Sequence, residues 1–255
     1  RRRGAERAVR AAAGRRARGA ARAPRSVRGA RAVPGDAGLE RVCRPSEGGA
    51  ARTKRALRGC VGAARGGGEA NAIAIRIARA ATGKDKVAIC GYHGWHDWYL
   101  AANLKNKNNL NNHLLKDLEP VGIPPGLKNT VIPFNFNDCE NIENICKKNK
   151  LAAIVIEGAR SVYPTKEFVK KLNFLKKKYG TCLIIDEITS GWRERTGGIY
   201  KTVGFKPDIV VYGKALGNGY AISAIVGKKK FMNKVQDTFV SSTAWTERVG
   251  FISAI

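Results

Sequence analysis

The sequence has few side chains that are spaced to bind a metal, and it has no apolar segment long enough to cross a membrane. Its six cysteines form no CxxC pair, and no third ligand lies near His93 and His96, so we expect no metal. No run of 18 apolar residues occurs, which argues against a membrane span, and the N-terminus lacks the hydrophobic stretch of a signal peptide. Cys90 and Cys182 lie in apolar runs that predict buried thiols, so we expect a reducing, cytoplasmic compartment.

The first 65 residues also lack aromatic side chains altogether. They carry 18 Arg and one Lys against four acidic residues, whereas residues 66–255 carry 6 Arg and 22 Lys against 16 acidic residues. A segment made mostly of Arg, Ala, Gly, Val and Pro cannot bury enough apolar surface to offset the entropy lost on folding. We therefore expect residues 1–65 to be disordered.

Three interpretations of this basic leader are open. Clustered arginine is typical of nucleic-acid-binding tails. An Arg-rich, acid-poor segment is also typical of an organelle transit peptide, although only two serines occur in it. The third interpretation, which we favour, is a wrong-frame or chimeric leader. Arg, Ala, Gly and Pro come from GC-rich codons, whereas the Lys, Asn and Ile of the later chain come from AT-rich ones.

The rest of the chain alternates apolar strands with amphipathic helices. Strands that are apolar throughout and separated by helices predict an α/β fold, with a mostly parallel or mixed sheet flanked by helices. Residues 97–130, which are rich in Asn and Lys, predict a long irregular segment with some helix. The predicted strands are 86–90, 130–134, 151–157, 181–187, 208–213 and 221–227.

Helical periodicity and capping residues predict three helices. The first lies within residues 69–83 and has Ile73, Ile77 and Ala80 on one face. The predicted caps are Gly83 at the end of this helix, Asn137 or Asp138 at the start of the second, and Thr165 and Gly180 at the two ends of the third.

Polar side chains directly follow four of the predicted strands. They are Tyr92 with His93, Glu157, Asp186 and Lys214. Ligands of open α/β sheets bind beyond the carboxyl ends of the strands. We therefore expect these residues to face one site.

Asp186 and Lys214 carry the chemistry expected there. A carboxylate that ends the run CLIID is costly to desolvate without a partner, and taken alone it is better explained as a structural acid. Lys214 lies between a buried strand and ALGNG, where reaching solvent is difficult. We therefore expect a desolvated, nucleophilic amine that can form a Schiff base.

A glycine turn and an aromatic residue complete the set. The run GGGEANA (66–72) places glycines before a helix N-terminus, where free amides can hold a phosphate, although a plain glycine loop has the same pattern. Tyr92 can stack on a flat ring, whereas Trp95, Trp98 and Tyr99 are typical of a structural aromatic cluster. A Schiff-base lysine, a carboxylate, a stacking aromatic and a phosphate cradle together predict a site for pyridoxal 5′-phosphate.

Residues 66–255 resemble the class-III pyridoxal-phosphate-dependent aminotransferases of fold type I. They are most similar to the glutamate-1-semialdehyde 2,1-aminomutase branch and its sugar- or spore-coat-associated relatives. The 28-residue step from Asp186 to Lys214 fits the family. The motifs that carry the resemblance are GEANAIAIRIARAATGKDKVAICGYHGWHD, LIIDEITSGWR, PDIVVYGKALGNGYAISAIVG and SSTAWTERVG.

The resemblance implies amino-group transfer between a small-molecule amino donor and an acceptor, by an aminotransferase or a 2,1-aminomutase. It implies that Lys214 forms the Schiff base and shuttles the proton. Asp186 would pair with the pyridine nitrogen. Tyr92 would stack on one face of the cofactor ring, and Ile188 would pack on the other.

The resemblance also implies how the phosphate is held. Gly67 and Gly68 would present amides to it, and Thr243 would reach the phosphate of the partner subunit in a homodimer. Glu157 and His93 would lie behind these residues and hold them in position. The family usually has Ser or Thr where Gly68 stands, so one hydroxyl donor is missing.

The resemblance also predicts the domain organisation. The family's N-terminal pocket-lining segment is not recognisable in residues 1–65, and the chain stops at Ile255, just past SSTAWTERVG. We expect a non-native or disordered leader at 1–65 and a pyridoxal-phosphate-binding large domain at 66–255. The small domain would be missing, leaving an incomplete substrate site in a fragment. The alternative functions are a racemase on the same scaffold and a nucleic-acid-binding protein acting through residues 1–65.

Overall fold

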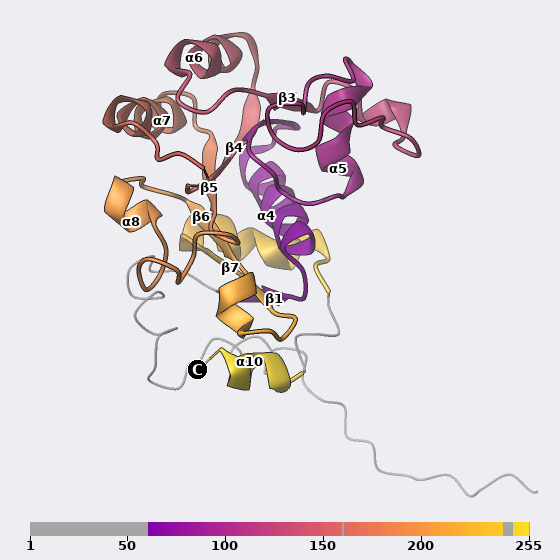
Figure 1. Ribbon diagram of the computed structural model, residues 1–255. Helices are drawn as coiled ribbons and strands as arrows, with labels where there is room; N and C mark the ends of the chain where they lie inside the picture. The colour runs from indigo at the N-terminus through magenta and orange to yellow at the C-terminus, as the bar shows by residue number, and fades with distance from the viewer. Residues whose placement is uncertain (1–60, 160, 242–246, 255) are drawn as a thin grey trace, which may run out of the picture. The chain divides into compact units, whose positions relative to one another are not determined.

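The computed structural model describes residues 61–159, 161–241 and 247–254, and within them seven strands form one sheet (Figure 1). Across the sheet they follow the order β1-β7-β6-β5-β4-β2-β3. The disorder predicted for residues 1–65 falls almost wholly outside the described residues. The strands are β1 (Val61–Ala64), β2 (Lys86–Cys90), β3 (Val131–Pro133), β4 (Leu151–Glu157), β5 (Cys182–Asp186), β6 (Ile209–Tyr212) and β7 (Ser223–Gly227).

The sheet is mixed and mostly parallel, which confirms the predicted α/β fold. Strands β6, β5, β4, β2 and β3 run parallel. At one edge β7 runs antiparallel to both of its neighbours, β6 and β1. Strands β4 and β5 are buried along their whole length because helices cover both faces of the sheet. The register aligns Glu157 with Asp186 at the carboxyl ends of these two strands.

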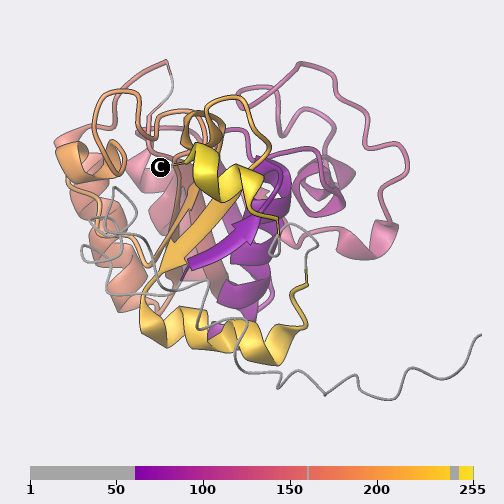
Figure 2. The ribbon, with the colours of Figure 1, turned by 90° about the horizontal axis from the view of Figure 1, so that it is seen from below.

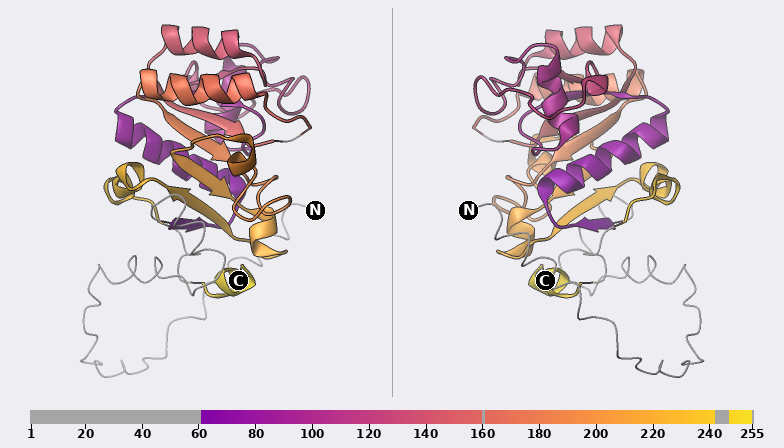
Figure 3. Two further views of the ribbon diagram at one scale, coloured as in Figure 1. Left: turned by 90° about the vertical axis from the view of Figure 1, so that its left-hand side faces the viewer. Right: turned by 90° about the vertical axis from the view of Figure 1, so that its right-hand side faces the viewer.

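Helices flank the two faces of the sheet (Figures 2 and 3). Helices α4 (Gly67–Thr82) and α5 (Asp97–Leu100) cover one face, and α6 (Cys139–Lys148) and α7 (Lys166–Lys178) cover the other. Alternate strand residues supply the two cores, so that Ile184 packs on the α4 side and Ile185 on the α7 side. The shorter helices are α8 (Tyr200–Val203), α9 (Lys229–Met232) and α10 (Val249–Ser253), with 3₁₀ turns at Ala101–Leu104, Pro125–Leu127, Lys214–Gly217 and Asn233–Thr238.

The irregular segment predicted at 97–130 is confirmed, because α5 and two 3₁₀ turns are its helical parts. No helix in the described part of the chain is long and apolar enough to span a membrane.

Helix α4 packs on the sheet through a face of small residues. Gly83 ends it in the left-handed conformation at φ 65°, as predicted. The prediction that Ala80 belongs to the buried face is wrong, because Ala80 is exposed. It lies two positions beyond the buried Ala78, roughly 200° around the helix from that residue. The fully buried alanines of that stripe are Ala70, Ala74 and Ala78.

Side-chain caps start the two helices on the other face. The Asp138 carboxylate accepts a hydrogen bond from the amide of Asn141 at 2.9 Å, which settles the predicted choice of cap at α6. Thr165 caps α7 as predicted. At the other end the prediction was displaced by one residue, because Tyr179 is the C-cap and Gly180, at φ 57°, follows it.

Replacing Thr165 with alanine is expected to lower the free energy of unfolding by about 1 kcal/mol. The reason is that the Thr165 hydroxyl accepts a hydrogen bond from the amide of Phe168 at 3.2 Å, and alanine leaves that amide without its cap. Thr165→Ser keeps the hydroxyl and is the matched control. Urea denaturation measures both variants, and equal losses in the two would contradict the capping role.

Strand β1 lies in the segment that the sequence assigned to the leader. It pairs antiparallel with β7, so that Ala64 is opposite Ser223. The division between residues 65 and 66 stays a prediction, but the sheet begins on the leader side of it. The strand has no sequence signal because VGAA does not differ in composition from the residues before it.

Candidate active site

A cavity of about 540 Å³ lies at the carboxyl ends of β2, β5 and β6, beside the N-terminus of α4. The structure brings most of the predicted site residues to its wall. Glu157 lines a neighbouring cavity, and Thr243 lies outside the described residues. The predicted residues that line the large cavity are Gly67, Gly68, Tyr92, His93, Asp186, Ile188 and Lys214.

The Asp186 carboxylate is buried in this wall, with 4% of the residue exposed, and three donors hold it. Its Oδ2 accepts hydrogen bonds from Asn71 Nδ2 at 2.8 Å and from His93 Nδ1 at 2.9 Å. Its Oδ1 accepts from the amide of Ile188 at 3.0 Å. These partners offset the cost of burying the carboxylate and fix its direction.

His93 links Asp186 to the backbone of β2. Its Nε2 lies 3.2 Å from the carbonyl oxygen of Cys90, which can only accept, so Nε2 carries a hydrogen. Its Nδ1 lies 2.9 Å from Asp186 Oδ2, so the ring bridges the carboxylate and the backbone of β2 inside the wall of the cavity.

Two backbone segments meet at the N-terminus of α4. A Cβ atom on Gly67 would lie 2.3 Å from Ile188 Cδ1. Gly94 has φ 109°, and a Cβ atom there would lie 2.6 Å from the Cα atom of Gly68. Only glycine permits both the conformation and the contact at Gly94. The first amides of α4 have no intrahelical acceptor, so this turn can bind an anion.

Lys214 lies at the rim of the cavity, and the prediction that it is desolvated is wrong, because the residue is exposed. Strand β6 ends at Tyr212, and Gly213 turns the chain so that Lys214 begins a 3₁₀ turn. Its Nζ donates a hydrogen bond to Thr189 Oγ1 at 2.9 Å. Its φ of 45° is uncommon for a residue with a side chain, and such conformations cluster at functional sites.

The aromatic residues near the cavity fall into two groups. Trp98 and Tyr99 are buried in the core, as the predicted cluster requires, and Tyr92 packs edge-on against Tyr99 with ring centroids 5.9 Å apart. Trp95 does not belong to this cluster, which corrects the prediction. It is 71% exposed and stacks on His96 with centroids 4.8 Å apart.

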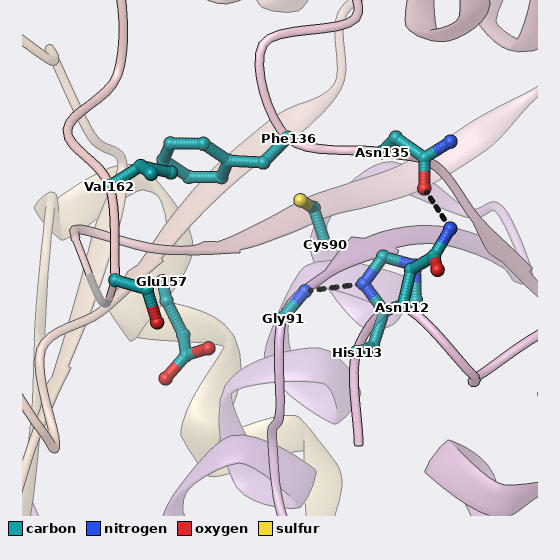
Figure 4. Close-up of a pocket in the computed structure, with 9 residues that line it drawn as sticks. Cys90, Gly91, Asn112, His113, Asn135, Phe136, Glu157 and Val162 are labelled. Atoms are coloured by element: carbon teal, nitrogen blue, oxygen red, sulfur yellow. Dashed lines mark hydrogen bonds between the residues drawn. The ribbon is translucent and has the colours of Figure 1, made fainter. Parts of the chain in front are cut away.

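Glu157 lines a second cavity of about 220 Å³ (Figure 4). The buried carboxylate accepts a hydrogen bond from the amide of Tyr92 at 3.0 Å. Burial and then the proximity of His93 lower the pKa of His113 to about 4, and its Nδ1 accepts a hydrogen bond from the amide of Gly91 at 3.2 Å. Burial and the nearby Glu157 raise the pKa of the Cys90 thiol. These contacts fix the turn that presents Tyr92.

Sequence reasoning missed several residues that shape the site. Asn71 was not singled out within the helix predicted at residues 69–83, although a polar residue in EANAIAI was its signal. Glu187 is fully buried, and burial raises its pKa. Its carboxylate accepts from Ser190 Oγ at 2.6 Å and from the amide of Tyr200 at 2.7 Å, which anchors the segment carrying Ile188 and Thr189.

Comparison with known proteins shows that this chain is similar in sequence and fold to aminotransferases. The family model described as aminotransferase class-III matches residues 52–246. The chain belongs to this family, as its resemblance predicted.

Two curated relatives illustrate the range of the family. The 3-aminobutyryl-CoA aminotransferase of Cloacimonas acidaminovorans is 38% identical over 198 residues, which cover 74% of this chain and 44% of the relative. The glutamate-1-semialdehyde 2,1-aminomutase of Sulfolobus acidocaldarius is 33% identical over 175 residues, which cover 66% and 40%. The chain thus spans less than half the length of these relatives.

A solved structure described as a transaminase with PLP bound matches with a TM-score of 0.69 and 25% identity. The match covers 81% of this chain and 51% of that one. Its fold therefore agrees with the family assignment.

Proposed function

We propose that this chain binds pyridoxal 5′-phosphate and forms the cofactor-binding part of an enzyme that transfers amino groups. The observation that carries the proposal is Asp186. It is buried, held by three donors, and lies in a cavity whose rim carries Lys214. A buried carboxylate and a primary amine in one cavity are the two groups that this cofactor needs most.

The residues present fit the cofactor in two further ways. The glycine turn at Gly67 and Gly68 leaves open backbone amides where a phosphate can approach. Two buried polar atoms of the same cavity, Asn71 Oδ1 and His96 Nδ1, have no hydrogen-bond partner among the described residues. Buried polar atoms of this kind are normally paired, so they mark places for a polar ligand.

When bound, pyridoxal phosphate supplies an electron-accepting ring that stabilises negative charge next to the amino nitrogen. Asp186 would accept the hydrogen of the ring nitrogen and keep it protonated. Lys214 would hold the cofactor through Nζ and then move a proton at that atom. Tyr92 and Ile188 would cover the two faces of the ring, and the amides of Gly67 and Gly68 would bind the phosphate.

The full enzyme's activity is proposed by family. We infer an aminotransferase or aminomutase that acts on a small-molecule amino donor and acceptor, as a homodimer in the cytoplasm. Membership of the class-III family supports the reaction type. Buried Cys90, Cys146 and Cys182 without disulfides support a reducing compartment. The dimer is what would bring Thr243 to a partner's phosphate.

Mixing the chain with pyridoxal phosphate is expected to produce a new absorption band in the near-ultraviolet or visible range. Borohydride should fix the adduct, and peptide mapping by mass spectrometry should place it on Lys214. Pyridoxal phosphate also labels surface lysines weakly, so substoichiometric cofactor is the control. Labels scattered over many lysines, or no band, would sink the cofactor assignment.

A further inference from the structure

We propose that His96 binds the cofactor's phosphate through Nδ1, in the place where Gly68 offers no side chain. The inference rests on the proposed binding of pyridoxal phosphate and assigns one more residue to that site. His96 lines the same cavity as Gly68, Asp186 and Lys214.

The imidazole of His96 occupies the space beside Gly68. A Cβ atom on Gly68 would lie 2.7 Å from His96 Nδ1 and 2.8 Å from His96 Cε1. A side chain at position 68 would therefore collide with the ring. Gly68 contributes a backbone amide to the turn but no hydroxyl, and the nearest side-chain polar atom to its missing Cβ is His96 Nδ1.

The surrounding structure holds the ring in this place. Gly94 packs its backbone on the Cα atom of Gly68, which brings the segment carrying His96 against the first turn of α4. The exposed Trp95 stacks on the imidazole with an interplanar angle of 24°. The ring therefore has little freedom to turn away from the glycine turn.

Nδ1 of His96 is buried and has no hydrogen-bond partner among the described residues. A buried donor or acceptor without a partner is costly, so a ring that only filled space would carry an unbalanced penalty. The atom lies beside the free amides at the start of α4, where the helix dipole favours negative charge. A phosphate oxygen at this turn satisfies the backbone amides and an Nδ1–H donor together.

A binding experiment measures how much affinity the phosphate group of the ligand adds. Pyridoxine 5′-phosphate and pyridoxine carry no aldehyde, so neither reacts with Lys214, and they differ in the phosphate alone. The ratio of their dissociation constants, from equilibrium dialysis with the 255-residue chain, is the phosphate gain. His96→Phe keeps the flat ring and its stacking, and is expected to reduce this gain about 10- to 100-fold.

His96→Asn is the matched variant, because its amide nitrogen can replace Nδ1 as a donor, and it should recover much of the gain. Trp95→Leu, which changes the stacked neighbour, should reduce the gain less than His96→Phe. If His96→Phe weakens both ligands equally, or neither, the role of His96 is wrong. The ³¹P resonance of bound pyridoxine phosphate should also shift in His96→Phe.

A second pair of variants tests whether the side chains at positions 68 and 96 compete for the same space. This test remains valid even when the His96→Phe variant does not fold. Gly68→Ser alone is expected to weaken phosphate binding, because its side chain meets the His96 ring. In the His96→Ala background the same serine should strengthen binding, since its hydroxyl then fills the vacated place. Equal effects in both backgrounds would contradict the inference. The Lys214 label tests the proposed function separately, because these ligands never react with Lys214.

Discussion

A chain with Lys214 replaced by alanine is expected to form no borohydride-fixed adduct with pyridoxal phosphate at this site. The Lys214 amine nitrogen forms the bond to the cofactor, so the adduct should be lost completely and not partially. The Asp186 carboxylate and the glycine turn remain, so reversible binding of the cofactor should persist. Absorption spectra and mass spectrometry after reduction measure the first effect, and equilibrium dialysis measures the second.

Two controls separate Lys214 from the many other lysines. Lys214→Arg keeps the positive charge but offers no primary amine, so it should behave like the alanine variant. Lys229→Ala removes an exposed lysine outside the cavity and should leave the band unchanged. Retention of a stoichiometric adduct in Lys214→Ala would show that another amine is the reactive one.

Replacing Asp208 with asparagine is expected to destabilise the fold by about 3–5 kcal/mol, because it breaks a buried ion pair. Asp208 lies where β5 and β6 begin and the antiparallel β7 ends, and only 7% of it is exposed. Its Oδ1 accepts from Lys176 Nζ at 3.0 Å and from Lys228 Nζ at 2.7 Å, and its Oδ2 accepts from the amide of Leu183 at 3.0 Å. Asparagine keeps the shape but leaves the buried Lys176 without a counter-charge.

The pH dependence of the destabilisation distinguishes an uncompensated charge on Lys176 from a packing defect. Burial lowers the pKa of Lys176 below 10.5, and Asp208 partly opposes that shift. Without Asp208 the folded-state pKa of Lys176 falls further, so the unfolded chain binds the proton more tightly. The loss of folding stability in Asp208→Asn should therefore be largest near neutral pH. It should shrink as the pH rises toward 10.5, where Lys176 loses its proton in both states.

Urea denaturation of Asp208→Asn at neutral and alkaline pH measures this effect. The double variant Asp208→Asn with Lys176→Met removes the uncompensated charge and should recover part of the loss. A deficit that does not change with pH and is not relieved in the double variant would contradict the buried-charge explanation.

Most of the sheet could be predicted from the sequence because its central strands are apolar throughout. LAAIVIE and CLIID have no polar residue before their last position, which is typical of strands covered on both faces. Strand β1 could not be found, because VGAA has the composition of the leader and is a strand through its pairing with β7. Ala80 was misplaced because an alanine can lie on either side of an amphipathic helix without changing its pattern.

The site was harder to predict where it depends on distant contacts. Asp186 ends a strand and was found by position, but its partner Asn71 is 115 residues away and has no motif of its own. Lys214 was found, yet its exposure depends on how Gly213 turns the chain. His96 was considered only as a metal ligand, because its approach to Gly68 is set by the left-handed Gly94. Spacing along the chain gives no information on such contacts.

The pairing of β1 with β7 also sets the order in which the molecule can assemble during synthesis. Ala64 and its partner Ser223 are 159 residues apart, and helix α4 packs against both β6 and β7. At a ribosomal rate of about 5–20 residues per second, roughly 8–30 s pass between the synthesis of β1 and the synthesis of β7. The glycine turn at Gly67 and Gly68, where α4 begins, is therefore among the first parts of the described chain to be made. It is among the last to be fixed, because non-local pairing forms late.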